Sequence, residues 1–159
     1  VAFRNEIDEM LAYNPLNFDA YNVAKAKTQG VEFQCDYAFG QKTDLHFGYT
    51  YLEAVDSDGR LTRRPRHSVN ISARHRLAEN LSLGISGLAS IDRMDIDPVT
   101  YATIKGKDYF VANLVADWDV TPQWSLYARV ENLFDKYHEP VAGYPALGRA
   151  GYLGARYRF

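Results

Sequence analysis

Residues 81–92 read Leu-Ser-Leu-Gly-Ile-Ser-Gly-Leu-Ala-Ser-Ile-Asp. Every odd-numbered residue of this stretch is apolar or glycine, and every even-numbered residue except Leu88 is serine, glycine or aspartate. Successive side chains of a β-strand point to opposite faces, so this pattern predicts a strand with one apolar face. A helix would instead repeat its apolar residues every three or four positions.

The same alternation recurs along most of the chain. It predicts further strands, the first weaker than the rest, at residues 3–11, 31–37, 45–51, 69–77, 110–120, 126–130 and 153–159. With the stretch quoted above, the sequence therefore predicts an all-β chain of about eight strands.

The connections between these strands alternate in length. Short turns are expected at residues 39–43, 78–80 and 119–123, and long polar or Gly/Pro-containing loops at 14–22, 53–66, 92–107 and 132–148. In an antiparallel sheet, all short turns then lie at one end and all long loops at the other. Membrane β-barrels combine short turns at one end with long loops at the other, whereas a soluble sandwich has no reason to do so.

Charged and aromatic residues indicate which face of the sheet is inside. The polar face carries charge in several strands, at Arg74, Arg76, Asp117, Arg129, Glu131, Arg156 and Arg158. Aromatic residues gather near strand ends, at Tyr37, Phe39, Trp118, Trp124, Tyr157 and Phe159. A polar lumen and aromatic girdles are typical of antiparallel transmembrane β-barrels. We therefore expect the outer, convex face to carry Leu83, Ile85, Ala112, Leu114, Leu126 and Ala128.

Composition limits the remaining possibilities. The 159 residues form one domain without linkers, and with 12 Tyr, 8 Phe and 2 Trp they are too aromatic for a disordered tail. Lys and Arg total 18 against 20 Asp and Glu, so the net charge of −2 predicts no binding to nucleic acid. The single cysteine, Cys35, cannot form an intrachain disulfide. Because it starts at Val1 within a strand, the chain is expected to be a piece of a longer polypeptide.

No catalytic or metal-binding constellation stands out. The histidines are scattered over different strands and a loop, at His46, His67, His75 and His138, without the spacing of a zinc site. Asp92, Asp95 and Asp97 lack the glycine and distal glutamate of an EF-hand loop, so we interpret them as turn-forming residues. The sequence predicts neither an enzyme nor a cofactor.

The C-terminal part of the chain carries an ordered set of motifs. Residues 131–137 read Glu-Asn-Leu-Phe-Asp-Lys-Tyr, residues 143–145 Gly-Tyr-Pro, residues 148–149 Gly-Arg, and residues 154–159 Gly-Ala-Arg-Tyr-Arg-Phe. Together these motifs resemble the C-terminal signature of TonB-dependent outer-membrane receptors. The resemblance implies that residues 1–159 are the C-terminal part of a barrel of about 22 strands in the bacterial outer membrane.

That resemblance also implies partners and roles. The plug domain and the segment that TonB grips would lie in an N-terminal part absent from this chain. In the family, the barrel assembly machinery recognises a last strand that ends in an aromatic residue, which implies an assembly signal at Tyr157 and Phe159. The outer face would contact outer-membrane lipid.

Within the family, the chain most resembles the vitamin B12 (cobalamin) receptors. The similar segments are residues 4–11, Arg-Asn-Glu-Ile-Asp-Glu-Met-Leu; residues 22–32, Asn-Val-Ala-Lys-Ala-Lys-Thr-Gln-Gly-Val-Glu; and residues 61–64, Leu-Thr-Arg-Arg. This resemblance implies uptake of cobalamin, with Arg63 and Tyr144 as ligand contacts. The alternatives are a ferric-siderophore receptor of the same family, a stand-alone eight-stranded outer-membrane barrel, and a soluble ligand-carrying barrel with an apolar interior.

Overall fold

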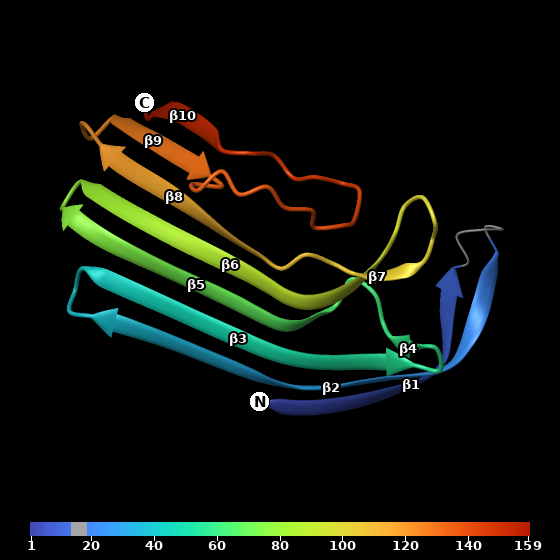
Figure 1. Ribbon diagram of the computed structural model, residues 1–159. Helices are drawn as coiled ribbons and strands as arrows, with labels where there is room; N and C mark the ends of the chain where they lie inside the picture. Colours follow the sequence, from blue (N-terminus) through green and yellow to red (C-terminus); the bar gives the residue numbers. More distant parts are fainter. Residues whose placement is uncertain (14–18) are drawn as a thin grey trace.

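The computed structural model describes residues 1–13 and 19–159, which form one antiparallel β-sheet (Figure 1). Its strands are β1 (Ala2–Tyr13), β2 (Ala20–Phe39), β3 (Thr43–Asp56), β4 (Gly59–Arg60), β5 (Pro65–Ala78), β6 (Leu81–Ile96), β7 (Thr103–Lys105), β8 (Tyr109–Asp119), β9 (Trp124–Glu131) and β10 (Ala150–Tyr157). The strand order is β1-β2-β3-β5-β6-β8-β9-β10, while β4 pairs only with β3 and β7 only with β6. Within the described residues, no helix is long and apolar enough to cross a membrane.

The eight strands of this path are those predicted from the sequence, but some of them are longer than expected. Strand β2 has 20 residues, and β6 continues to Ile96, inside the predicted loop 92–107. At about 3.3 Å per residue, β2 spans about 65 Å, well beyond the 25 Å or so of a membrane barrel's apolar band. Outside that band a strand need not keep one face apolar. Apolar alternation in the sequence therefore locates only the part of each strand that lies within the band.

The predicted segregation of turns and loops is confirmed. Residues 40–42, 79–80 and 120–123 connect strands at the left of Figure 1, and Gly40 allows the first turn its positive φ of 64°. At the other end lie residues 57–64 with β4, residues 97–108 with β7, and residues 132–149. The short strands β4 and β7 were missed within the predicted loops. Of the predicted loop 14–22, residues 14–18 lie outside the described residues.

Strand register places the apolar residues on one face. Ile85 pairs with Ala73 on β5 and with Leu114 on β8, and Leu114 pairs in turn with Val130. The next row, on the opposite face, joins Ser72, Ser86 and Asn113. The same parity puts Leu83, Ala112, Leu126 and Ala128 on the face of Ile85.

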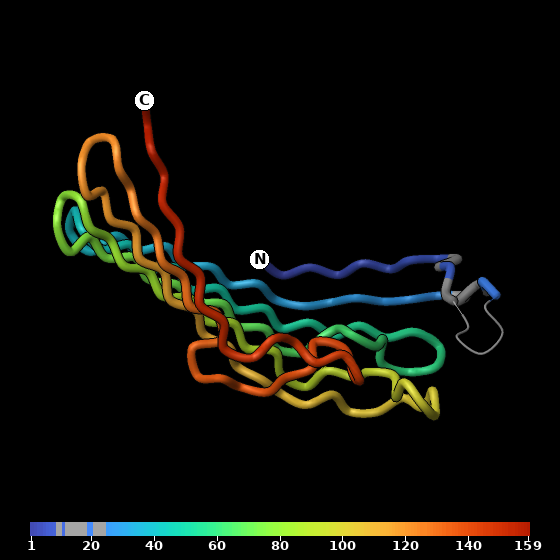
Figure 2. Tube along the Cα trace, turned by 90° about the horizontal axis from the view of Figure 1, so that it is seen from above, coloured from blue at the N-terminus to red at the C-terminus, as the bar shows by residue number. Residues whose placement is uncertain are grey.

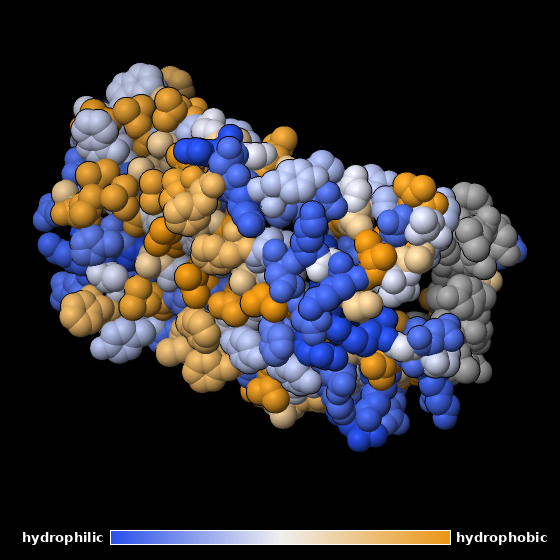
Figure 3. Space-filling model, in the orientation of Figure 1, coloured by the Kyte–Doolittle hydropathy of each residue, from blue (hydrophilic) through white to orange (hydrophobic). Residues whose placement is uncertain are grey.

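This apolar face is not covered by a second layer. Ile85 is 45% exposed, and the buried apolar residues among those the structure describes are few and small: Ala26, Ala54, Ala112 and Ala142. Figure 3 shows apolar side chains gathered over the turn-side half of the face, with polar side chains at both ends. Figure 2 shows the central strands bowed toward the viewer of Figure 1, so this face is the convex one. The apolar residues do not converge in an interior, which excludes the soluble carrier barrel.

The sheet is open. Among the described residues, β1 and β10 are the two edges, and the views of Figures 1 and 2 show them apart. The chain is therefore a curved section of wall and not the closed eight-stranded barrel that the sequence left as an alternative.

Candidate ligand site at the loop end of the sheet

The loop end of the sheet is held together by two aspartates of β6. Asp92 and Asp95 lie where β6 extends past the apolar band. Asp92 faces Arg60 of β4, and Asp95 faces the loop between β9 and β10. Each carboxylate forms ion pairs with more than one cation, and together the two carboxylates pair with five cationic side chains.

Asp92 joins β6 to the residues around β4 and β7. Its Oδ1 lies 3.0 Å from Arg60 Nη1 and 3.7 Å from Lys105 Nζ, and its Oδ2 lies 3.0 Å from Arg66 Nη1. The backbone N–H of Asp92 donates to Asp108 Oδ1 at 2.8 Å. The hydrogen bond from Arg60, with the charges of Arg60, Arg66 and Lys105, lowers the pKa of Asp92 in spite of its burial.

Asp95 is fully buried and joins the Arg63 segment to the loop between β9 and β10. Its Oδ1 accepts hydrogen bonds from Ile96 N–H at 2.9 Å and from Arg63 Nε at 3.3 Å. Its Oδ2 accepts one from Ala142 N–H at 2.9 Å and lies 3.2 Å from Arg93 Nη2. Burial alone would raise the pKa of Asp95, but these donors and charges outweigh it and lower that pKa.

The interpretation of the three aspartates as turn formers is correct only for Asp97. Its Oδ1 accepts hydrogen bonds from the N–H groups of Val99 and Thr100, at 2.9 Å and 2.8 Å. Asp92 and Asp95 bind cations from other segments instead. Among the residues described, no group of histidine, cysteine, aspartate or glutamate side chains could hold a metal ion.

The two residues predicted to contact ligand both lie at this end. Arg63 has a left-handed backbone, with φ of 59°, and its side chain is 53% exposed although its Nε reaches Asp95. Tyr144 is 70% exposed and closes a turn in which its N–H donates to Val141 O at 2.9 Å. Gly143, at φ of 80°, supplies the left-handed position of that turn. Because Ala142 of the same turn binds Asp95, one carboxylate contacts both Arg63 and the Tyr144 turn.

The Asn-Leu-Phe-Asp motif shapes the loop that carries Tyr144. Asn132 is buried, with φ of 49°, a conformation that asparagine tolerates better than most residues. Its Nδ2 donates to Lys136 O and Leu147 O at 3.0 Å and 3.2 Å, and its Oδ1 accepts from Lys136 N–H at 2.8 Å. Asp135 Oδ1 accepts from Arg149 N–H at 2.7 Å. Hydrogen bonds of the motif therefore connect the beginning of the loop to its end.

The two residues predicted as an assembly signal lie at the opposite end of the sheet. The ring of Tyr157 is 4.9 Å from that of Trp124 and 5.1 Å from that of Phe159. Phe159 is fully exposed. These aromatics form an exposed cluster at the turn end, separate from the loop-end site.

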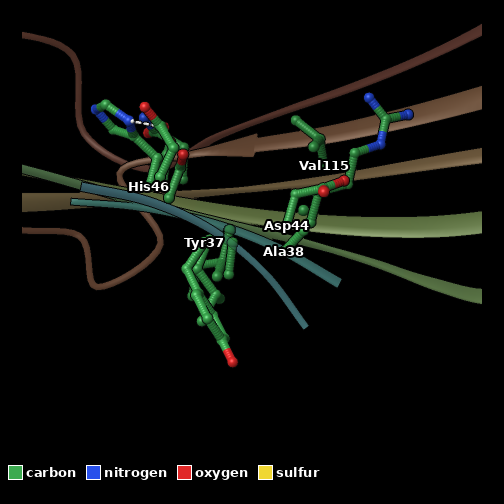
Figure 4. A pocket seen from close by; sticks show the side chains of 14 residues that line it. Tyr37, Ala38, Asp44, His46 and Val115 are labelled. Carbon is green, nitrogen blue, oxygen red and sulfur yellow. Dashed lines mark hydrogen bonds and ion pairs between the residues drawn. The ribbon is translucent and has the colours of Figure 1, made fainter. Parts of the chain in front are cut away.

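The polar face contains a hollow of about 550 Å³ near the turn end. In Figure 4, His46, Asp44 and Val115 stand on one side of the sheet and Tyr37 points away on the other. The His46 ring is hydrogen-bonded through Nδ1 to Asp36 Oδ1 at 2.6 Å and through Nε2 to Asn70 Oδ1 at 2.9 Å.

Other charged residues of this face also pair with one another. Arg74 lies 3.1 Å from Asp117, and Arg129 lies 3.3 Å from Glu131. Within the described part of the chain, the polar face thus carries several paired charged side chains.

Solved structures of several larger proteins contain a sheet that resembles this one. The chain aligns with the Ferric-Catecholate import receptor Fiu of Escherichia coli K12 at a TM-score of 0.79 and 20% identity, over 99% of this chain and 24% of that one. For the ferripyoverdine receptor of Pseudomonas aeruginosa the TM-score is 0.78 and the identity 18%, over 98% and 24%. For the siderophore receptor PirA of Acinetobacter baumannii the values are 0.76 and 18%, over 99% and 29%.

These likenesses show the fold, and the chain spans about a quarter of each of these proteins. The family assignment comes from sequence. Residues 1–133 match the model of the family described as TonB dependent receptor-like, beta-barrel, which is most of the chain. Family and neighbours are transport receptors and not enzymes. The chain therefore belongs to the β-barrel family of TonB-dependent receptors.

Proposed function

We propose that this chain forms part of the wall and mouth of a bacterial outer-membrane receptor that takes up a ferric siderophore. The observation that carries the proposal is the cationic loop end, where five arginine and lysine side chains surround two carboxylates. Ferric complexes of catecholates are anionic, and within this cluster the five cations outnumber the two carboxylates, which suits an anion. The similar structures whose names mention ferric catecholate, ferripyoverdine and siderophore support the same ligand class.

Cobalamin is the second candidate. The Arg63-Arg64 pair and Tyr144 are the features that favour it, because they resemble the cobalamin receptors. An exposed tyrosine offers a flat surface of low conformational entropy, and a half-exposed arginine offers fixed donors. The same two residues would also suit a planar catecholate. A measurement of binding is therefore needed to distinguish the two candidate ligands.

The remaining partners belong to the same proposal. The apolar face would contact outer-membrane lipid, the barrel assembly machinery would act on the last strand, and TonB would act through the N-terminal part of the receptor. The rest of the barrel and its plug would complete the ligand site above the polar face.

Arg63→Ala and Tyr144→Ala in the intact receptor are each expected to weaken ligand binding by at least about tenfold. Truncating an aromatic or arginine anchor commonly costs about 2 kcal/mol or more. The measurement is equilibrium binding of an iron(III) catecholate complex and, separately, of cobalamin to purified receptor.

Arg158→Ala at the turn end is the matched control, with unchanged affinity expected. Unchanged affinity in both loop variants would remove Arg63 and Tyr144 from the site. Binding of cobalamin but not of iron(III) catecholate would transfer the assignment to the second candidate.

Deleting Phe159 is expected to lower the amount of folded receptor in the outer membrane severalfold, while the receptor that does fold keeps its ligand affinity. The reason is that an aromatic terminus can be recognised only while the last strand is unpaired. Heat-modifiable electrophoretic mobility of outer-membrane fractions measures the folded amount, and Arg158→Ala again serves as control. Normal yield combined with weakened binding would argue against an assembly role for Phe159.

A further inference from the structure

The buried carboxylate of Asp95 contacts two loop segments and links them. A charge removed from water is costly unless it is paired and hydrogen-bonded, and Asp95 has four such partners. Of these, Arg63 and Ala142 come from segments far apart in the sequence, and both contact this carboxylate. A buried residue with this arrangement restrains both segments at once.

Further contacts fix each segment to β6. The backbone N–H of Arg63 donates to Met94 O at 2.7 Å, which supports its left-handed conformation. Arg93, only 4% exposed, also donates through Nη2 to Glu139 O at 2.8 Å, so the Tyr144 loop is bound to β6 a second time. The buried Nε of Arg93 has no hydrogen-bond partner, and the Asp95 carboxylate lies 3.2 Å from Nη2 of the same guanidinium group.

We propose that Asp95 is a positioning residue that sets the placement of Arg63 relative to Tyr144 and so prepares the receptor mouth for ligand. This inference rests on the proposed function. The carboxylate needs no contact with ligand, because it is fully buried, while Arg63 and Tyr144 keep exposed surfaces. Preorganised contacts bind more tightly because less ordering is needed when the ligand arrives.

Asp95→Asn is the first test, because it keeps the shape of the side chain and removes its charge. We expect the two loops to separate in part, since the amide cannot accept from every donor and Arg93 loses the carboxylate that lies 3.2 Å from its Nη2. Affinity for an iron(III) catecholate complex should fall by at least about tenfold, equivalent to about 1.4 kcal/mol.

Loop placement is measured without ligand, by electron spin resonance distances in the full receptor. Nitroxides are attached at Arg64→Cys and Leu147→Cys, both exposed positions, in a Cys35→Ser background that removes the native exposed thiol. We expect a narrow distance distribution in the parent receptor and a broad one with Asp95→Asn. Asp97→Asn is the matched control, because Asp97 holds only its own turn and should change neither distance nor affinity.

Ala142→Pro is the second variant and covers the case in which Asp95→Asn does not fold. Position 142 is the second residue of the turn closed by Tyr144, where proline is favoured, and proline replaces the N–H that binds Asp95 with a ring carbon. It should broaden the distances and weaken binding. Broadened distances with unchanged affinity, or unchanged distances, would overturn the role of Asp95. A parent receptor with narrow distances that binds no ferric siderophore would instead overturn the proposed function.

Discussion

Ile85→Arg should destabilise the membrane-inserted receptor by about 2–4 kcal/mol, whereas Ser86→Arg should cost about 1 kcal/mol or less. The two residues are neighbours on β6 and point to opposite faces. Ile85 lies in the apolar row with Leu114, facing lipid in the proposed orientation, and Ser86 lies in the polar row with Asn113. An arginine at Ile85 would have to place its charge in hydrocarbon, but one at Ser86 would enter a polar lumen.

The measurement is denaturant unfolding of the two variants in lipid vesicles, followed by the loss of heat-modifiable mobility. Both variants add the same side chain to the same strand. Any difference between their free energies of unfolding therefore comes from the face of the sheet on which the arginine lies. Equal costs, or a larger cost at Ser86, would show that the apolar face does not contact lipid.

Gly30→Ala should destabilise the sheet by about 1–3 kcal/mol, the usual cost of forcing an added group into a packed site. Gly30 pairs with Phe3 on β1 and with Leu52 on β3. A Cβ there would clash with the backbone oxygen of Tyr51 and lie 2.8 Å from Phe3 Cζ, so either the backbone or the ring must move. Gly30 is thus the position in the Gly-Val-Glu motif where close strand approach requires glycine.

Gly151→Ala is the control, because a Cβ at that position of β10 would have no neighbour within 4 Å. We expect it to change stability by less than about 0.5 kcal/mol in the same unfolding measurement. If Gly30→Ala behaved like Gly151→Ala, the packing of Phe3 over β2 would be wrong.

The sequence predicted the long strands because apolar alternation reports a physical requirement. Where one face meets lipid, as proposed for Ile85 and Leu114, every second residue must be apolar, and the register confirms the shared face. Beyond that band both faces can be polar, so the extension of β6 to Ile96 left no periodic signal. The short strands β4 and β7 have only two and three residues, too few to show a period.

The site was only partly predictable for a different reason. Arg63 and Tyr144 were named through resemblance, and both lie at the loop end. From the sequence, the aspartates that connect this end look like local turn formers, because a turn can be inferred from neighbouring residues. An ion pair such as Arg60–Asp92 joins residues 32 positions apart and becomes visible only in the folded sheet. Charge complementarity between residues 60–66 and 92–95 was the available signal.

The orientation of the sheet in the membrane can be measured directly. Nitroxides are placed one at a time on β6 at Leu83→Cys, Ile85→Cys, Ser82→Cys and Ser86→Cys, in the full receptor with Cys35→Ser in lipid bilayers. Collision rates are recorded with oxygen, which concentrates in hydrocarbon, and with a water-soluble nickel complex. We predict a higher oxygen-to-nickel ratio at Leu83 and Ile85 than at Ser82 and Ser86. The reverse order, or equal ratios at all four positions, would contradict a β-barrel wall that faces lipid with its apolar side.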